Sequence, residues 1–273
     1  MAGPAPRLGD GRRSARSEHT GPPPGGRRRA LNRLSPTLAG PSLWRAVIFD
    51  LFGTLVAGWG QASAARKATE LAALLEVPAG QFQAVLSATY DRRARGELGA
   101  PRQMLEELCR MLGCQPPPKA LERAAALRVS QFREVLRSPR PEVPELFARL
   151  CAGGIAIGMI SDCSGETPLI WPELVWAKPI TAPVFSFQER QRKPAAELYH
   201  LAASRLGVRV GECLYVGDGG SQELSGARAA GMEAWQLLLP RQDGEPHLQY
   251  DPDPNWDGPR IRDLRQLLGP APG

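Results

Sequence analysis

The sequence lacks the features of a membrane protein and of a cysteine-rich metal protein. No apolar run approaches the roughly 18 residues that a bilayer span requires, so we expect no membrane segment. The five cysteines include no CxxC pair and have no histidine at a metal-ligand spacing. An odd number of cysteines without a secretion signal is typical of reduced thiols, and we therefore expect a cytoplasmic protein.

Histidine and lysine are scarce as well, which narrows the candidates for catalytic groups. None of the three histidines lies in a motif or at a ligand spacing, so we expect no catalytic or metal-binding role for them. Lysine occurs only at Lys67, Lys119, Lys178 and Lys193. We interpret the large excess of arginine over lysine as a bias of genomic base composition and not as a functional signal.

Basic charge is concentrated at the start of the chain. Residues 1–43 contain eight arginines and two acids, which accounts for the whole net charge of +6 and leaves the remainder neutral. The folded part therefore gives no indication of nucleic-acid binding. Residues 1–43 are rich in Pro, Gly, Arg and Ser, and too poor in large apolar residues to offset the entropy of ordering, so we predict a disordered tail. Three interpretations stay open for it: a solvated tail or over-long gene start, a tether for nucleic acid or an acidic surface, and an organelle transit peptide.

The pattern after this tail predicts an α/β protein. Ala46–Phe49 is an all-apolar stretch, as expected for a parallel strand covered on both faces. From Pro144 onward, strand and helix patterns alternate, with strands at 155–160, 184–186, 213–216 and 234–238 and helices at 144–152, 194–206 and 221–230. This alternation predicts a doubly wound, Rossmann-like parallel sheet.

A long helical insertion separates the first strand from the rest of this pattern. Residues 63–137 consist of Ala-, Leu- and Arg-rich runs that Pro and Gly interrupt, with almost no strand signal. An insertion of about eighty residues is far too long for a simple loop. We therefore predict a core formed by residues 44–62 and 141–273, and a helical cap formed by residues 63–140.

Four motifs bring chemically useful residues to the carboxyl ends of the predicted strands or, in one case, to the start of a helix. The motifs are VIFDLFGTLV, IAIGMISDCS, RKPAAELY and CLYVGDGGSQEL, and their central residues are Asp50, Ser161, Lys193 and Asp218. Open parallel sheets bind their ligands at this edge. Taken singly, each motif also has a purely structural explanation, as a helix cap, a turn, a helix start or a flexible turn.

Together and in this order, the four motifs resemble those of the haloacid dehalogenase superfamily, over roughly residues 44–240. The resemblance implies a hydrolase whose Rossmann-like core carries a helical cap of the C1 type, closing over a small molecule. It implies Asp50 as the nucleophile and a Mg²⁺ ion held by hard oxygen ligands. The implied ligands are Asp50, Asp218 and the backbone carbonyl of Phe52, with Glu223 acting through a water. The implied substrate contacts are made by Thr54, Ser161, Asp162 and Lys193.

The sequence departs from the phosphatases of this family at one position. Their second aspartate, two residues after the nucleophile, is Phe52 here, which can neither protonate a leaving group nor activate water. Such acid–base assistance contributes about 10²–10⁴-fold. A phosphatase with this site should therefore be slow on alkyl phosphates and less affected on aryl or acyl phosphates.

Three functions stay open on the residues alone. The first is Mg²⁺-dependent hydrolysis of a small phosphorylated metabolite through an aspartyl-phosphate on Asp50, which the retained Asp218 favours. The second is dehalogenase-like, carbon-centred hydrolysis, since the haloacid dehalogenases resemble this chain in having an aromatic residue at position 52. Their halide-binding cap arginine has candidates in Arg92, Arg93 and Arg95. The third is a weakly active or non-catalytic protein that binds a phosphorylated metabolite.

Two further expectations concern the third motif and the assembly. Lys178, which also precedes a proline, competes with Lys193 for the role of the third-motif lysine. We favour Lys193 because a helix pattern follows it. The chain is expected to be a monomer or a homodimer.

Overall fold

The computed structural model describes Gly3 and residues 44–238, 249–253 and 256–269. The chain divides into two units, Met1–Ser35 and Pro36–Gly273, and the elements below all belong to the second. The predictions made for residues 1–43 lie outside the described residues, apart from Gly3.

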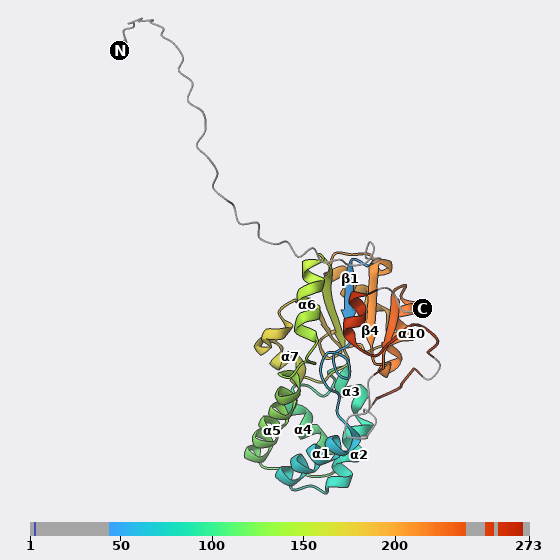
Figure 1. Ribbon diagram of the computed structural model, residues 1–273. Coiled ribbons are helices and arrows are strands. Elements are labelled where there is room, and N and C mark those ends of the chain that lie inside the picture. The colour runs from blue at the N-terminus through green and yellow to red at the C-terminus, as the bar shows by residue number, and fades with distance from the viewer. Residues whose placement is uncertain (1–2, 4–43, 239–248, 254–255, 270–273) are drawn as a thin grey trace, which may run out of the picture. The chain divides into compact units, whose positions relative to one another are not determined.

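A six-stranded parallel sheet forms the centre of the second unit (Figure 1). The strands are ordered β3-β2-β1-β4-β5-β6, and each pair of neighbours is parallel. Their bounds are β1 (Ala46–Phe49), β2 (Ala156–Ser161), β3 (Ile180–Phe185), β4 (Cys213–Gly217), β5 (Glu233–Leu237) and β6 (Arg260–Ile261). β1 lies between β2 and β4 and is buried throughout, as its apolar sequence predicts. The predicted doubly wound parallel sheet is confirmed.

Helices and short turns of 3-10 helix connect these strands. The helices are α1 (Gln61–Leu75), α2 (Ala79–Ala88), α3 (Tyr90–Ala94), α4 (Pro101–Met111), α5 (Pro118–Leu136), α6 (Val143–Ala152), α7 (Glu166–Ile170), α8 (Ser186–Glu189), α9 (Ala196–Arg205) and α10 (Glu223–Ala229). The 3-10 turns are Trp171–Glu173, Val175–Ala177, Val210–Glu212, Gly220–Gln222 and Leu264–Leu268.

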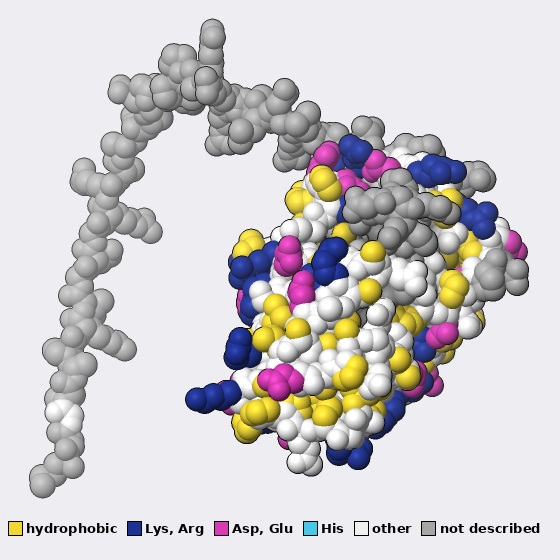
Figure 2. All heavy atoms as spheres, turned by 90° about the horizontal axis from the view of Figure 1, so that it is seen from below, with side chains coloured by type: hydrophobic (Ala, Val, Ile, Leu, Met, Phe, Trp, Pro, Cys, Tyr) yellow, Lys and Arg dark blue, Asp and Glu magenta, His cyan; other side chains and the backbone are white. Residues whose placement is uncertain are grey.

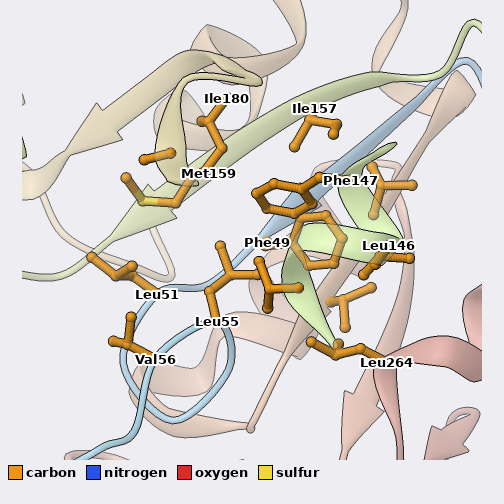
Figure 3. Packing of buried hydrophobic residues seen from close by; sticks show 14 of the residues in the cluster. Phe49, Leu51, Leu55, Val56, Leu146, Phe147, Ile157, Met159, Ile180 and Leu264 are labelled. Carbon is orange, nitrogen blue, oxygen red and sulfur yellow. The ribbon is translucent and has the colours of Figure 1, made fainter. Parts of the chain in front are cut away.

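Helices cover both faces of the sheet, because successive side chains of a strand point to opposite faces. Val47 and Phe49 of β1 face α6, where Phe49 packs on Phe147 with the ring centroids 5.7 Å apart (Figure 3). Ala46 and Ile48 belong to a second cluster, which includes residues of α9 and α10. Two hydrophobic clusters therefore hold β1 from opposite sides and fix the position of the residue that follows it.

Helices α1 to α5 all lie between β1 and α6 in the sequence, and form the helical insertion. They have a hydrophobic cluster of their own, which includes Leu71, Phe82 and Leu105. Among the described residues, no single helix is long and apolar enough to cross a bilayer, and α1 and α2 pass that test only as a pair bent by 116°. The separate cluster supports the proposed cap, whose boundaries at 63 and 140 stay a prediction.

The structure differs from the predicted elements mainly at the edges of the sheet. β3 runs from Ile180 to Phe185, whereas the sequence predicts a strand only at 184–186. Pro183 interrupts the strand pattern in the sequence, so the residues before it were not predicted as a strand. A proline is tolerated here because β3 is an edge strand. α10 begins at Glu223 and not at 221, because Ser221 and Gln222 have φ angles of 55° and 49°.

Charged side chains of both signs are interspersed on the face shown in Figure 2. Arg95 pairs with Asp91, Arg110 with Glu107, and other exposed arginines of the helical insertion have acidic neighbours of the same kind. Exposed pairs of this sort contribute little to stability. Their main consequence is that positive and negative charges alternate on the described surface of the insertion, without a large patch of one sign.

Gly226 allows α10 to pack closely against the loop and helix that follow Lys193. A Cβ on Gly226 would lie 2.6 Å from Pro194 Cβ and 2.7 Å from the Tyr199 hydroxyl. We predict that Gly226→Ala lowers the free energy of unfolding by about 1–3 kcal/mol, because a packed interior resists added volume. Urea denaturation measures this change.

Gly80→Ala is the matched control for that substitution. Gly80 is an exposed residue of α2, and a Cβ there would meet nothing within 4 Å. Alanine should therefore be neutral or stabilising by up to about 1 kcal/mol at this position. Equal losses of stability in the two variants would contradict the packing explanation.

Candidate active site

The predicted catalytic residues meet at one edge of the sheet. Ser161 is the last residue of β2, Asp50 follows β1, and Asp218 follows β4. Lys193 lies in the loop between α8 and α9, and its Nζ is 2.6 Å from Asp50 Oδ1. Lys178, the competing lysine, is exposed. The order of the strands thus brings together residues that are far apart in the sequence.

A tight loop after β1 fixes the position of Asp50. The Asp50 amide donates a hydrogen bond to the Val216 carbonyl of β4, at 2.9 Å. Gly53 has a φ of 88°, and a Cβ at this position would collide with the carboxylate of Asp218. Arg140 donates hydrogen bonds to two carbonyls of the loop, at 2.8 and 3.3 Å. The glycine of the first motif is therefore required both by its backbone conformation and by the space that Asp218 occupies.

Lys193 is the centre of a buried polar cluster. Its Nζ donates to Asp50 Oδ1 at 2.6 Å and to Glu223 Oε2 at 2.5 Å. Glu223 Oε2 also accepts from the Tyr215 hydroxyl at 2.8 Å, and Oε1 accepts from the Gly219 amide at 2.9 Å. Both oxygens of Glu223 are therefore engaged by protein groups. The role of Tyr215 was not predicted, because a tyrosine inside a strand gives no signal of its own.

Burial and mutual charge shift the pKa values of this cluster. Burial would lower the pKa of the Lys193 ammonium, but the carboxylates of Asp50 and Glu223 hold it well above its usual value. Burial raises the pKa of Asp50 to about 6, against the attraction of Lys193. Burial and the charge of Asp50 raise the pKa of Glu223 to about 8. Lys193 therefore remains protonated and neutralises part of the acidic charge.

Asp162 holds the loop that carries Lys193. Its Oδ1 accepts a hydrogen bond from the Lys193 amide at 3.0 Å, and its Oδ2 accepts one from Arg192 Nε at 3.2 Å. Both carboxylate oxygens thus have protein partners, although Asp162 also lines the cavity described below. The substrate contact that the resemblance implies for Asp162 stays a prediction.

Three buried side-chain oxygens of the predicted catalytic residues have no hydrogen-bond partner among the described residues. They are Asp50 Oδ2, Thr54 Oγ1 and Ser161 Oγ. An unsatisfied buried polar group costs about 1–3 kcal/mol, so a fold keeps several together only where something else satisfies them. Their positions at the ends of the adjacent strands β1 and β2 fit a polar, oxygen-rich ligand at this edge.

The carboxylates of the site also fit a divalent cation. Asp50, Asp218 and Glu223 each offer an oxygen, and these oxygens lie within 4.8 Å of one another. The Phe52 carbonyl, the fourth predicted ligand, accepts no hydrogen bond from the described residues. Oxygen donors of this kind suit Mg²⁺. Since both oxygens of Glu223 are already engaged, Asp50, Asp218 and the Phe52 carbonyl are the better candidates.

A cavity of about 270 Å³ lies over these residues. Asp50, Lys193 and Asp218 line it on the side of the sheet, and residues of α1, α2, α3 and α5 line it on the side of the helical insertion. Phe52, Trp59 and Phe132 form an aromatic wall of this cavity, with Trp59 and Phe132 packed edge to face at 4.5 Å. The side chain at position 52 is thus part of an apolar surface in the cavity that Asp50 also lines.

Arg192 links three segments of the chain through ion pairs, and one of its partners, Asp162, lines the cavity. Its guanidinium pairs with Asp162 after β2, with Asp91 of α3 at 3.4 Å, and with Asp251 at 2.9 Å. The rings of Tyr90 and Tyr250 stack on each other with their centroids 3.6 Å apart, and the guanidinium of Arg192 lies beside the Tyr90 ring. The sequence gives no sign of this arrangement, because the partners are distant along the chain and no motif contains them.

A buried ion pair lies on the side of α5. Arg128 Nε donates to Glu166 Oε1 at 2.5 Å, and the Ser164 hydroxyl donates to the other oxygen of Glu166. Burial opposes the charge of Glu166, but the nearby Arg128 guanidinium holds the pKa of Glu166 below its usual value. This pair links the helical insertion to α7 of the core.

The fold places an aspartate, a serine and a second aspartate after neighbouring strands of a parallel sheet, with a buried lysine beside the first aspartate. The sequence matches the haloacid dehalogenase-like hydrolase family over residues 44–231. The chain belongs to this family, and it is a hydrolase. The resemblance that the four motifs predict is thereby confirmed.

The chain is similar in sequence to two phosphatases and in structure to a dehalogenase. Glyceraldehyde 3-phosphate phosphatase of Methanopyrus kandleri is 31% identical over 158 residues, which are 56% of this chain and 66% of that protein, just under two thirds. Phosphoglycolate phosphatase of Salmonella paratyphi A is 27% identical over 241 residues, or 82% of this chain and 92% of that protein. The 2-haloacid dehalogenase of Pseudomonas syringae pv. tomato has a similar structure, with a TM-score of 0.59 at 21% identity, covering 82% of this chain and 96% of that chain. This last likeness shows the fold alone.

Removal of the buried carboxylate of Glu166 should destabilise the fold. We predict that Glu166→Gln lowers the free energy of unfolding by about 3–5 kcal/mol at pH 7, because Arg128 keeps a buried charge without a counter-charge. The folded-state pKa of Glu166 is depressed, so its contribution is present above the unfolded-state pKa and is lost as the pH falls through the folded-state pKa. The difference between the wild type and the variant should therefore shrink in acid.

Chemical denaturation at a series of pH values measures that difference. Glu173→Gln is the matched control, because Glu173 pairs with Arg133 and Arg137 on the surface and solvent screens such pairs. Its effect should be small at every pH. A loss of stability that is the same for both variants, or that does not depend on pH, would count against the buried pair.

Proposed function

We propose that this hydrolase is a Mg²⁺-dependent phosphatase that acts on a small phosphorylated metabolite through an aspartyl-phosphate on Asp50. The observation that carries the proposal is that Asp50 Oδ2, Thr54 Oγ1 and Ser161 Oγ are buried without partners among the described residues, while the other oxygen of Asp50 contacts the ammonium of Lys193. A phosphoryl group supplies the acceptors that the two hydroxyls lack. The phosphatase names of two relatives support the same reaction class.

The proposed first step uses the free oxygen of the nucleophile. Asp50 Oδ1 is held by Lys193, so Asp50 Oδ2 is the oxygen without a hydrogen bond. Attack by the Asp50 carboxylate on phosphorus forms the aspartyl-phosphate and breaks the bond to the leaving-group oxygen, which departs with the electron pair. Lys193, Thr54 and Ser161 donate hydrogen bonds to the anionic oxygens of the phosphoryl group, where charge must be stabilised.

A divalent cation held by Asp50, Asp218 and the Phe52 carbonyl would neutralise the charge of the phosphoryl group. Glu223 keeps Lys193 in place from the opposite side of the ammonium. In the second step, water attacks the phosphorus of the aspartyl-phosphate, and the bond between phosphorus and the Asp50 oxygen breaks with its electron pair left on the carboxylate. Inorganic phosphate leaves with the protons of the water, and Asp50 is regenerated. Phe52 can take no proton from this water and can give none to the leaving group.

A carbon-centred reaction is the second candidate, and Phe52 is the observation that favours it. A halide leaves without a proton, so an apolar wall beside Asp50 is compatible with dehalogenation. Without a cation, however, the carboxylates of Asp50, Asp218 and Glu223 would repel one another at short range, and Lys193 alone supplies only one positive charge to the cluster. The phosphatase proposal therefore takes precedence, with a non-catalytic binding protein as the remaining alternative.

Hydrolysis of para-nitrophenyl phosphate by the purified protein tests the first proposal. We predict turnover that requires Mg²⁺, stops with EDTA, and falls to the uncatalysed level in Asp50→Asn, which removes the nucleophile with little change of shape. Asp257→Asn makes the same chemical change at an exposed surface pair with Arg228 and should leave the rate as it is. Both variants are compared in steady-state assays.

Two outcomes would argue against the phosphatase. Full activity of Asp50→Asn would show that the mechanism is wrong. No hydrolysis with any divalent metal would favour the other two functions, and halide release from 2-chloropropionate would then separate the dehalogenase from the binding protein.

Position 52 should set how strongly the rate depends on the leaving group. We predict that kcat/KM of the wild type falls steeply as the pKa of the leaving alcohol rises across a series of aryl and alkyl phosphates. Phe52→Asp should flatten this dependence and raise the alkyl rates by about 10²–10⁴-fold, if the new carboxyl group donates a proton.

Phe52→Asn is the matched control for this series. Asparagine removes the same aromatic contacts with Trp59 and Phe132 but cannot protonate an alkoxide. Thermal unfolding of both variants verifies that they fold. A similar slope in the wild type and in a folded Phe52→Asp variant would show that the phenylalanine does not limit departure of the leaving group.

A further inference from the structure

Arg93 is a buried guanidinium on the side of the cavity that the helical insertion forms. The residue is only 8% exposed and lines the same cavity as Asp50. Its Nη2 donates to the Leu86 carbonyl at 2.8 Å, and its Nε lies 3.4 Å from the Thr89 hydroxyl. These contacts hold the side chain in one orientation. Among the described residues, Nη1 has no acceptor, and no carboxylate forms an ion pair with Arg93.

The charge near Arg93 is not balanced within the protein. Arg128, which also lines the cavity, is matched by Glu166, so the buried set of Arg93, Arg128 and Glu166 keeps one positive charge. The carboxylate of Glu70 approaches the nearby Gln131, but Glu70 is exposed and solvated. Burial and the charge of Arg128 lower the pKa of Arg93 to about 10, and the guanidinium is therefore still charged at neutral pH.

Such a charge is costly to bury without a counter-charge, and buried charges in proteins are normally paired. Arg93 needs no charge of its own to hold α3, because its two fixed hydrogen bonds go to a carbonyl and a hydroxyl. A negative group that enters the cavity would provide the missing counter-charge. The hydrogen bonds from Nε and Nη2 fix the orientation of the guanidinium, and Nη1 remains available to donate to this negative group.

We propose that Arg93 binds a carboxylate of the substrate, so that the substrate is a small phosphorylated carboxylic acid. Its phosphoryl group lies at Asp50 and its carboxylate lies at Arg93. The phosphoryl end of this assignment rests on the function proposed above, whereas the carboxylate end rests on Arg93 and its surroundings alone.

The surplus charge favours a carboxylate over a second phosphoryl group. One uncompensated positive charge matches the single charge of a carboxylate, while a phosphate monoester carries up to two. The aromatic wall of Phe52, Trp59 and Phe132 adds no further positive charge. Lys67, which also lines the cavity, lies 3.7 Å from Glu134 and 5.9 Å from the Trp59 ring, so it already has a counter-charge.

Binding of phosphonates that cannot be hydrolysed tests the proposal without turnover. The ligands are phosphonoacetate, 3-phosphonopropionate and 4-phosphonobutyrate, each compared with its primary amide by calorimetry on the full chain with Mg²⁺. The acid of the best chain length should bind the wild type at least about tenfold more tightly than its amide, as expected for a hydrogen bond to a charged group. The amide has nearly the same shape, so the ratio of the two dissociation constants isolates the charge.

Three variants locate this preference. Arg93→Gln should bring the ratio of acid to amide affinity close to one, while Arg93→Lys, which keeps the charge, should retain part of it. Arg92→Gln is the matched control, because Arg92 is the exposed neighbour in α3 and pairs with Glu97. It should retain the full ratio. Circular dichroism and thermal unfolding verify that each variant folds, and Arg93→Lys serves where Arg93→Gln does not.

Each other outcome overturns the proposal in a recognisable way. Equal binding of acid and amide by the wild type at all three lengths would remove the carboxylate contact and leave the phosphatase proposal intact, provided that the amides bind. An unchanged preference in Arg93→Gln would assign the carboxylate to another group. Tighter binding of alkylene bisphosphonates than of the acids would replace the carboxylate with a second phosphoryl group. If no ligand binds, both the carboxylate contact at Arg93 and the phosphoryl contact at Asp50 are contradicted. The para-nitrophenyl phosphate assay then reports on the phosphoryl contact separately.

Discussion

The site depends on the ion pairs that the buried ammonium of Lys193 forms with Asp50 and Glu223. Asp50 and Glu223 are both shielded from water, and burial opposes a negative charge on either, so the ammonium that contacts both of them supplies the positive charge that they need. The surrounding structure serves to place this ammonium: Asp162 anchors its loop, Tyr215 and the Gly219 amide hold Glu223, and Gly226 lets α10 approach. The active edge of the sheet is therefore stabilised as a set of mutually compensating charges.

Much of this arrangement could be predicted from the sequence, because strand ends are local features. An apolar strand followed by Asp50 gives its own signal, and so do Ser161 and Asp218. Parallel strands end at one edge, so these residues meet without any knowledge of distant contacts. The edge strand β3 was only partly predicted, because Pro183 interrupts a pattern that a central strand would not tolerate.

The surroundings of the cavity could not be predicted in the same way. Arg128 and Glu166, or Arg192 and Asp251, are pairs whose members lie on different elements, and nothing in the residues near either partner reveals the other. Arg93 is one of three arginines among residues 92–95, and only the fold shows that this one is buried while Arg92 is exposed and Arg95 is half-buried. Burial of a helix face depends on what packs on it, which a short helix does not encode.

The cavity wall also includes residues outside the segment that matches the family. The family match ends at residue 231, yet Gln249 and Tyr250 line the cavity. Backbone hydrogen bonds from Ser221 and Gln222 to the carbonyls of Tyr250 and Asp251 bind this segment to the fourth motif. Two hydrolases with the same arrangement of residues at this edge of the sheet can therefore differ in the molecules that they admit, since part of the wall is built by residues outside the segment that matches the family.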